Sequence, residues 1–251
     1  MTPTPLAEAA LSAVSGLGLP VPATGPVTRA AAVAAVDAVA GLAPDTTAAA
    51  TYQDVASTSS AFGAIEAAVQ AGLMAGWAPT SGDFQPDAPM SRIDLAVLAT
   101  NALGLRARAM ALAGDTGAFS GLTDLAFAGA NRGYAVLMLE MGIVPPVSAT
   151  RFMPNAAVTP GELAVSLERL WLDADVPAAA TLTPASPRVL TGATDALSLA
   201  VTNRLGRPVP ARNLMRYPAT FRVSGGSVAN GAFLAPAPGT YQVTARCRAP
   251  S

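Results

Sequence analysis

The chain has 251 residues, of which 51% are hydrophobic and 12% are charged, with 22 Gly and 22 Pro. It has no His, no Lys and one Cys, which excludes zinc sites built on Cys and His, Ser-His-Asp triads, Walker-type lysines and Schiff-base lysines. The net charge of -1 hides a charge of -8 over residues 1–179 and +7 over residues 180–251. This change coincides with a segment rich in Pro and Ala at 175–184 and predicts a boundary near residue 180, between domains at 1–178 and 181–251.

The first predicted element is an amphipathic helix near the N-terminus. Its apolar residues recur at helical spacing: Leu6, Ala10, Ala13, Val14 and Leu17. The same stretch has neither a basic start nor a continuous apolar core, so we expect no secretory signal in it. No apolar run in the chain reaches the ~18 residues of a membrane span, so we expect a soluble protein.

A short motif then recurs three times and predicts three helix starts. The copies are VTRAAA at 27–32, MSRIDL at 90–95 and VTPGEL at 158–163. Thr28, Ser91 and Thr159 are suited to cap the helices, and Asp94 and Glu162 stand three residues later, where a capping-box acid belongs.

The residue after each cap differs between the copies: it is Arg29, Arg92 and Pro160 in turn. Pro is well tolerated at the first helical position, so capping does not require Arg there. An arginine at a helix N-terminus opposes the helix dipole, so we expect the two arginines to have another role.

Further landmarks surround these motifs. Helical patterns with apolar faces precede the second and third copies, formed by Phe62, Ile65, Ala68 and Val69 and by Tyr134, Leu137, Met138 and Met141, and both end in glycine. Asp54 lies 18 positions before Gly72, and Asp124 lies 18 positions before Gly142. We expect these two aspartates to brace local turns. The landmarks indicate three repeated units, at about 5–45, 50–107 and 118–173.

The segment from Tyr52 to Leu105 resembles a surface-layer homology repeat, whose pattern is aromatic-x-Asp-Val, a helix, a Gly-rich loop, Phe-x-Pro and Thr-Arg-Ala-Glu. It carries YQDV, GLMAGW and DFQPDAPMSRIDLAVLATNALGL, the third unit matches through LTDL and FMPNAAVTPGEL, and the first matches more weakly. The resemblance implies a mostly α-helical pseudo-threefold domain over about 5–173. It implies non-covalent binding of pyruvylated secondary cell-wall polysaccharide by a non-enzymatic, extracellular protein of the cell wall or S-layer.

The resemblance also implies which residues bind the polysaccharide. Arg29 and Arg92 match the motif arginine, which faces the Gly-rich loop of the next unit and can hold the carboxylate of a pyruvyl ketal. In the second unit, Gly72, Gly76 and Gly82 would allow close approach of a sugar, and Trp77 would offer a flat apolar face. The alternative is that Trp77 is a core aromatic and the arginines bridge surface acids.

If the binding grooves lie between successive units, they are unequal. The first pairs Arg29 with the loop 72–84, and the second pairs Arg92 with the loop 142–152, where two prolines replace flexible backbone. The third pairs Pro160 with the loop 18–25 and has no cation at the motif position. We therefore predict that the groove of Arg29 binds most strongly and that the groove of Pro160 is a structural relic.

The C-terminal segment has a different pattern. ALSLAVTN, ATFRVSGG and GTYQVTARC alternate apolar and polar residues between turns such as Asn230-Gly231 and Pro238-Gly239, which indicates short antiparallel strands. The stretch FRVSGGSVANGAFLAPAPGTYQVTAR resembles the end of a bacterial immunoglobulin-like domain, which implies an all-β sandwich at 181–251, although the segment is short for seven strands. The expected fold class is α+β multidomain. We expect lone Cys247 to be buried.

Two other classes of function remain open. In one, the chain is a structural subunit of a surface lattice or filament, and the repeats bind protein instead of sugar. In the other, it is a glycosidase that uses carboxylates such as Glu66 and Asp94, although its acids occupy capping and surface positions. We expect no metal, cofactor or nucleic-acid partner, and we expect self-association between the acidic N-terminal and basic C-terminal domains, with docking inside one chain as the alternative.

Overall fold

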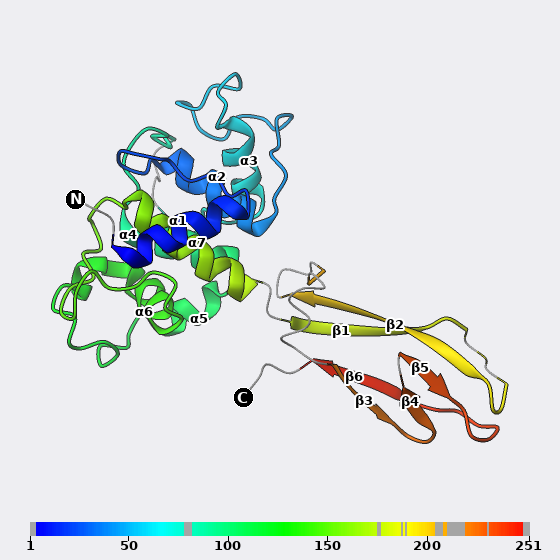
Figure 1. The fold of residues 1–251 in the computed structure, drawn as a ribbon. Coiled ribbons are helices and arrows are strands. Elements are labelled where there is room, and N and C mark those ends of the chain that lie inside the picture. Colours follow the sequence, from blue (N-terminus) through cyan, green and yellow to red (C-terminus); the bar gives the residue numbers. More distant parts are fainter. Residues whose placement is uncertain are drawn as a thin grey trace. The chain divides into compact units, whose positions relative to one another are not determined.

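The computed structural model describes residues 4–77, 82–174, 177–186, 188, 190–203, 208–209, 219–229 and 231–247. The chain divides into two compact units, residues 1–173 and 174–251, and the first is helical while the second contains β-strands (Figure 1). The described part is therefore an α+β multidomain structure. None of its helices combines the length and hydropathy that crossing a membrane requires.

The helices of the first unit begin and end close to where the capping and apolar patterns predict. They are α1 (Pro5–Gly16), α2 (Arg29–Ala40), α3 (Phe62–Gln70), α4 (Arg92–Ala102), α5 (Arg106–Ala111), α6 (Arg132–Glu140) and α7 (Pro160–Ala174), with a 3-10 turn, η1, at Leu125–Asn131. The hydroxyls of Thr28 and Ser91 accept hydrogen bonds from backbone N–H groups three residues later, and Thr159 does the same for Glu162. The predicted N-caps are thus confirmed.

The segments that enter α2, α4 and α7 are joined by a closed set of backbone hydrogen bonds, and among the described helices α2 packs against α3 and α4 packs against α6. The N–H of Val27 donates to the carbonyl of Val158 at 3.2 Å, that of Val158 donates to Met90 at 2.8 Å, and that of Met90 returns to Val27 at 2.8 Å. All three residues are buried and each immediately precedes an N-cap. The segments that enter α2, α4 and α7 therefore meet in a cyclic arrangement at the centre of the unit.

The turns before α4 and α7 are braced by aspartates. Asp54 accepts hydrogen bonds from the N–H groups of Phe84 and Gln85 at 2.7 and 2.6 Å. Asp124 accepts from Phe152 and Met153, both at 2.9 Å. Gln85 and Met153 have φ of 57° and 58°, a left-handed conformation that costs free energy outside glycine. The aspartates brace turns as predicted, but these turns are not local, because they lie 28 to 31 residues further along the chain.

The second unit holds two small antiparallel sheets. Its strands are β1 (Pro177–Pro184), β2 (Thr194–Asn203), β3 (Ala219–Val223), β4 (Ser227–Ala229), β5 (Ala232–Leu234) and β6 (Val243–Cys247). One sheet has the order β1-β2-β5-β4 and the other pairs β3 with β6. The sequence predicts strands at β2, β3 and β6, but it assigns β1 to the boundary segment. Its Pro/Ala-rich residues pair with β2 along most of their length.

The core of this second unit is thin. Along β2 the residues Asp195, Val201 and Asn203 are buried, but Leu197 and Leu199 on the same face are only half-buried. In β3 the inward residues are half-buried as well. The turn predicted at Asn230 lies outside the described residues, as does the side chain of Cys247.

Candidate functional site

The first arginine site consists of Arg29, Trp77 and Phe84. The guanidinium carbon of Arg29 lies 5.0 Å from the centroid of the Trp77 ring and 5.5 Å from that of Phe84, within the range of a cation–π interaction. The two rings meet edge to face at 5.7 Å. Arg29 is half-buried, whereas Trp77 is 5% and Phe84 is 0% exposed. The structure thus brings Arg29 to the loop with which the sequence pairs it.

Backbone contacts fix both sides of this site. The N–H of Arg29 donates to the carbonyl of Ala88 at 2.9 Å, so the start of α2 is tied to the segment after Phe84. On the other side, the amide of Asn101 in α4 donates to the carbonyls of Leu73 and Ala75, both at 2.8 Å. The Gly-rich loop is therefore held by α4, the next α-helix along the chain.

The three glycines that were predicted to approach a ligand differ in what surrounds them in the structure. All of them have positive φ, which suits glycine. Gly72 follows the C-terminus of α3, where an added Cβ would meet nothing within 4 Å. An added Cβ at Gly76 would lie 3.0 Å from the hydroxyl of Tyr134, and Gly82 lies beside the side chain of Gln53. Of these positions, Gly76 is the one where an added Cβ would come into tight contact with a neighbouring side chain.

Trp77 does not offer an exposed platform. Its ring is 5% exposed and packs on Phe84, and its indole N–H is buried with no hydrogen-bond acceptor among the described residues. The expectation of a ring face open to sugar therefore differs from the structure, in which Trp77 is a core aromatic. The reason is that Arg29 and Phe84 both cover it.

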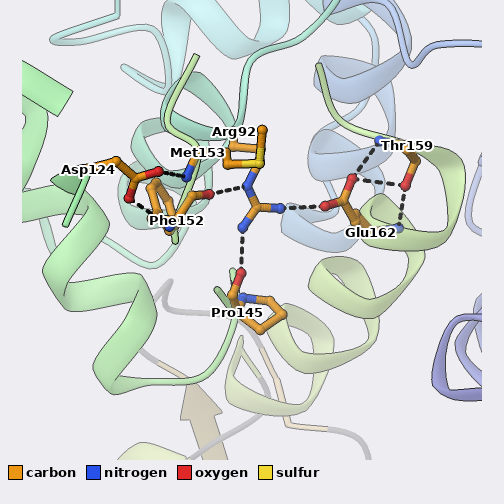
Figure 2. Close-up of polar contacts among 7 residues, drawn as sticks. All are labelled: Arg92, Asp124, Pro145, Phe152, Met153, Thr159 and Glu162. Carbon is orange, nitrogen blue, oxygen red and sulfur yellow. Dashed lines mark hydrogen bonds and ion pairs between the residues drawn. The ribbon is translucent and has the colours of Figure 1, made fainter. Parts of the chain in front are cut away.

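The second arginine site consists of Arg92, Pro145, Phe152 and Glu162 (Figure 2). Arg92 Nε donates to the carbonyl of Phe152 at 2.7 Å, and Nη2 donates to that of Pro145 at 2.5 Å. Nη1 pairs with Glu162 Oε1 at 2.6 Å. The guanidinium carbon lies 5.0 Å from the centroid of the Phe152 ring, the same geometry that Arg29 has with its aromatic neighbours.

Arg92 is a buried structural residue. It is 2% exposed, and each of its three side-chain nitrogens donates to an acceptor of the chain. Burial lowers the pKa of Arg92, and the carboxylate of Glu162 opposes that change. An arginine keeps its proton under such conditions, so the pair remains ionic. The expectation that Arg92 faces a polysaccharide thus differs from the structure, because the chain itself surrounds the guanidinium.

The third position has no cation. Pro160 begins α7, and an added Cβ at Gly161 would lie 2.8 Å from the Cβ of Ala7 in α1. Figure 1 shows α1 and α7 crossing in the first unit. The packing of α1 against α7 fills the space beside this motif.

The acids considered for a glycosidase have structural contacts. Glu66 is 1% exposed, and its carboxylate accepts hydrogen bonds from the N–H and hydroxyl of Thr51 at 2.8 and 2.7 Å. Asp94 lies in the first turn of α4, where its N–H donates to Ser91. Neither contact supplies the pair of facing carboxyl groups that glycoside hydrolysis requires.

Sequence reasoning missed two features. It did not identify Glu162 as the partner of Arg92, because capping explained that acid fully. It also gave no sign of a cavity of about 750 Å³ in the second unit, lined by β-strand residues that include Leu182, Leu197, Phe233 and Val243. The thin core of this unit accounts for the cavity.

Residues 51–96 match the model of the S-layer homology domain family. The match spans α3, the first arginine site apart from Arg29, and the first turn of α4. Domains of this family generally act as non-catalytic anchoring modules of the cell wall or S-layer. No curated protein matches the chain.

Proposed function

We propose that this chain anchors a protein to the bacterial envelope by binding cell-wall polysaccharide without catalysis. The observation that carries the proposal is the S-layer homology match at residues 51–96. The cyclic hydrogen bonds of Val27, Met90 and Val158 support the view that the three units that contain α2, α4 and α7 are three such repeats, and the family match covers the second. An envelope anchor acts outside the cell, at the cell wall or S-layer.

The ligand contact is the first arginine site. Arg29 is half-buried at the N-terminus of α2 and stands over two aromatic rings that orient its side chain. A guanidinium beside a helix N-terminus suits the carboxylate of a pyruvyl ketal. The Gly72–Trp77 loop and Gly82 shape the backbone around it, and Trp77 acts through Arg29 rather than by stacking on a sugar.

A sedimentation assay tests this function. The whole chain is mixed with purified secondary cell-wall polysaccharide, either intact or after mild acid removal of its pyruvyl ketals. We expect the intact polymer to retain the protein and the stripped polymer to lose at least tenfold in affinity, because a charge-assisted hydrogen bond contributes roughly 1.5 to 3 kcal/mol. Equal retention would exclude the ketal as the recognised group, and no retention would exclude the anchoring function.

We propose that the second unit is an immunoglobulin-like sandwich that acts as a spacer. The strand order β1-β2-β5-β4 corresponds to A-B-E-D of a constant-type immunoglobulin domain, and the pair β3-β6 corresponds to C-F. The half-buried inner residues of β2 and β3 agree with a sandwich in which the described residues supply six of seven strands. A spacer of this kind would carry no ligand of its own.

A second candidate is a lattice subunit in which the helical unit binds protein. The observation that favours it is the charge division of -8 against +7, because oppositely charged domains of successive copies attract one another. A protein that ignores the polysaccharide and forms salt-sensitive oligomers would support this candidate in place of the anchor.

A further inference from the structure

Glu162 lies in an arrangement that proteins use to bind anions. Its Oε1 accepts from Arg92 Nη1 at 2.6 Å, and its Oε2 accepts from the N–H and the hydroxyl of Thr159, both at 2.9 Å (Figure 2). The carboxylate thus rests between a guanidinium and the N-terminus of the 15-residue helix α7. A guanidinium and a helix N-terminus are the two features that hold a bound carboxylate or phosphate in many proteins.

The first arginine site resembles the second in the position of its guanidinium. Arg29 and Arg92 occupy corresponding positions, one residue after the caps of α2 and α4, and each lies over a buried phenylalanine. The acid that occupies in α4 the position of Glu162 in α7 is Asp94, whose side chain is one methylene shorter.

The exposure of the two partners shows which one faces solvent. The side chain of Arg92 is 2% exposed, whereas that of Glu162 is 31% exposed. The remaining donors of Arg92 point to the carbonyls of Phe152 and Pro145. Glu162 therefore stands between solvent and the guanidinium of Arg92. Its carboxylate fills the position that a carboxylate from solution would take.

We infer that Glu162 is an internal ligand that closes the second arginine site, so that a carboxylate-bearing ligand binds the site of Arg29 and not that of Arg92. The inference rests on the proposed function for the identity of the ligand, but its chemical basis is independent of it. The second site is a carboxylate site already occupied by the chain. Removing the Glu162 carboxylate opens it to small carboxylates from solution.

Thermal unfolding in different salts tests the chemical basis. Glu162→Ala leaves Arg92 without its anion, so we expect the melting temperature to fall by roughly 5 to 15 °C in sodium chloride. Replacing the chloride with acetate at equal ionic strength should raise it again by about 3 °C more than in the wild type, through binding to the folded state. Glu162→Gln, which keeps the cap and still fills the site, should respond to acetate as the wild type does.

Two controls make the result specific. Glu140→Ala removes the acid of an exposed ion pair, in which the side chains are 57% and 34% exposed, and it should show no acetate effect beyond that of the wild type. If Glu162→Ala gains no more from acetate than Glu140→Ala does, the second site does not bind carboxylates and the inference is wrong.

Calorimetry with a pyruvylated polysaccharide fragment provides a second test that does not depend on the alanine variant folding. Glu162→Asp shortens the side chain by one methylene and draws its carboxylate away from the guanidinium of Arg92. We expect the wild type to bind one equivalent and Glu162→Asp to bind two, and an unchanged stoichiometry would overturn the inference. If neither protein binds the fragment, the proposed function fails, and the acetate experiment still decides the chemistry of Glu162.

Discussion

Asp37 in α2 carries a buried carboxyl group that lacks hydrogen bonds, within the described part of the chain, to offset the loss of solvation. It is 4% exposed, and neither oxygen has a hydrogen-bond partner among the described residues. Burial raises the pKa of Asp37 from 3.8 to about 7. Because the folded pKa exceeds the unfolded one, the folded state holds the proton more tightly. The free energy of unfolding should therefore fall as the pH rises from about 4 to about 7.

The substitution Asp37→Asn removes this dependence. At pH 4 the variant and the wild type both carry a neutral group there and should be similar in stability. At pH 8 the variant should be more stable by up to about 4 kcal/mol, measured by urea unfolding at both pH values. Asp83→Asn, at an exposed position, should show no such difference between the two pH values. If Asp37→Asn changed the stability equally at both pH values, burial would not raise the pKa of Asp37 in the folded protein.

The individual side chains show which properties sequence alone could predict. The caps Thr28, Ser91 and Thr159 were predictable because their partners lie three residues later in the chain. The turns that Asp54 and Asp124 brace could not be located from sequence, because they lie 28 to 31 residues away. The burial of Arg92 was not predictable either, because its motif is the same as that of Arg29. The difference arises from Glu162, which lies 70 positions away and reaches Arg92 only when the starts of α4 and α7 meet in the folded unit.

Among the elements, helices α5 and α6 approach closely at a glycine. An added Cβ at Gly133 would lie 1.9 Å from the carbonyl oxygen of Ala109 and 2.8 Å from the nitrogen of Ala113. These are backbone atoms, so they can make room only if the helices separate. The sequence shows Gly133 only as a weak helix former, because the contact depends on how the two helices pack.

Gly133→Ala should therefore destabilise the first unit by about 3 kcal/mol, as overpacking against backbone does. The matched control is Gly114→Ala, where an added Cβ would meet nothing within 4 Å. Circular dichroism during urea unfolding measures both. Equal effects in the two variants would show that α5 and α6 do not make this contact.

The strands illustrate a different limit of sequence reasoning. Alternation predicted β2, β3 and β6, but β1 is composed largely of Ala, Thr and Pro and has no apolar pattern. Its pairing with β2 over Ala179–Pro184 depends on backbone hydrogen bonds, which do not depend on side-chain type. Composition therefore indicated a linker where the chain forms an edge strand.

For the whole molecule, the division into an acidic helical unit and a basic β-unit predicts salt-sensitive association. Attraction between exposed charges of neighbouring copies is screened over ~8 Å at physiological ionic strength. Analytical ultracentrifugation of the full chain should show oligomers at about 20 mM salt that dissociate at about 300 mM.

The exposed arginines Arg222 and Arg246 in β3 and β6 provide the control for this prediction. Changing both to Glu should abolish the oligomers at low salt while the monomer remains folded. A monomer at low salt and high concentration in the wild type would exclude association between copies and leave docking within one chain as the consequence of the charge division.

The account of the molecule depends most on the claim that the chain holds a carboxylate-bearing polysaccharide through Arg29. Isothermal titration calorimetry of a pyruvylated fragment into wild type, Arg29→Ala and Arg106→Ala tests it most directly, since Arg106 is an exposed arginine elsewhere on the same unit. The account predicts one site in the wild type and in Arg106→Ala, and a loss of about tenfold to a hundredfold in affinity in Arg29→Ala with its fold intact. Unchanged affinity in a folded Arg29→Ala protein would contradict it.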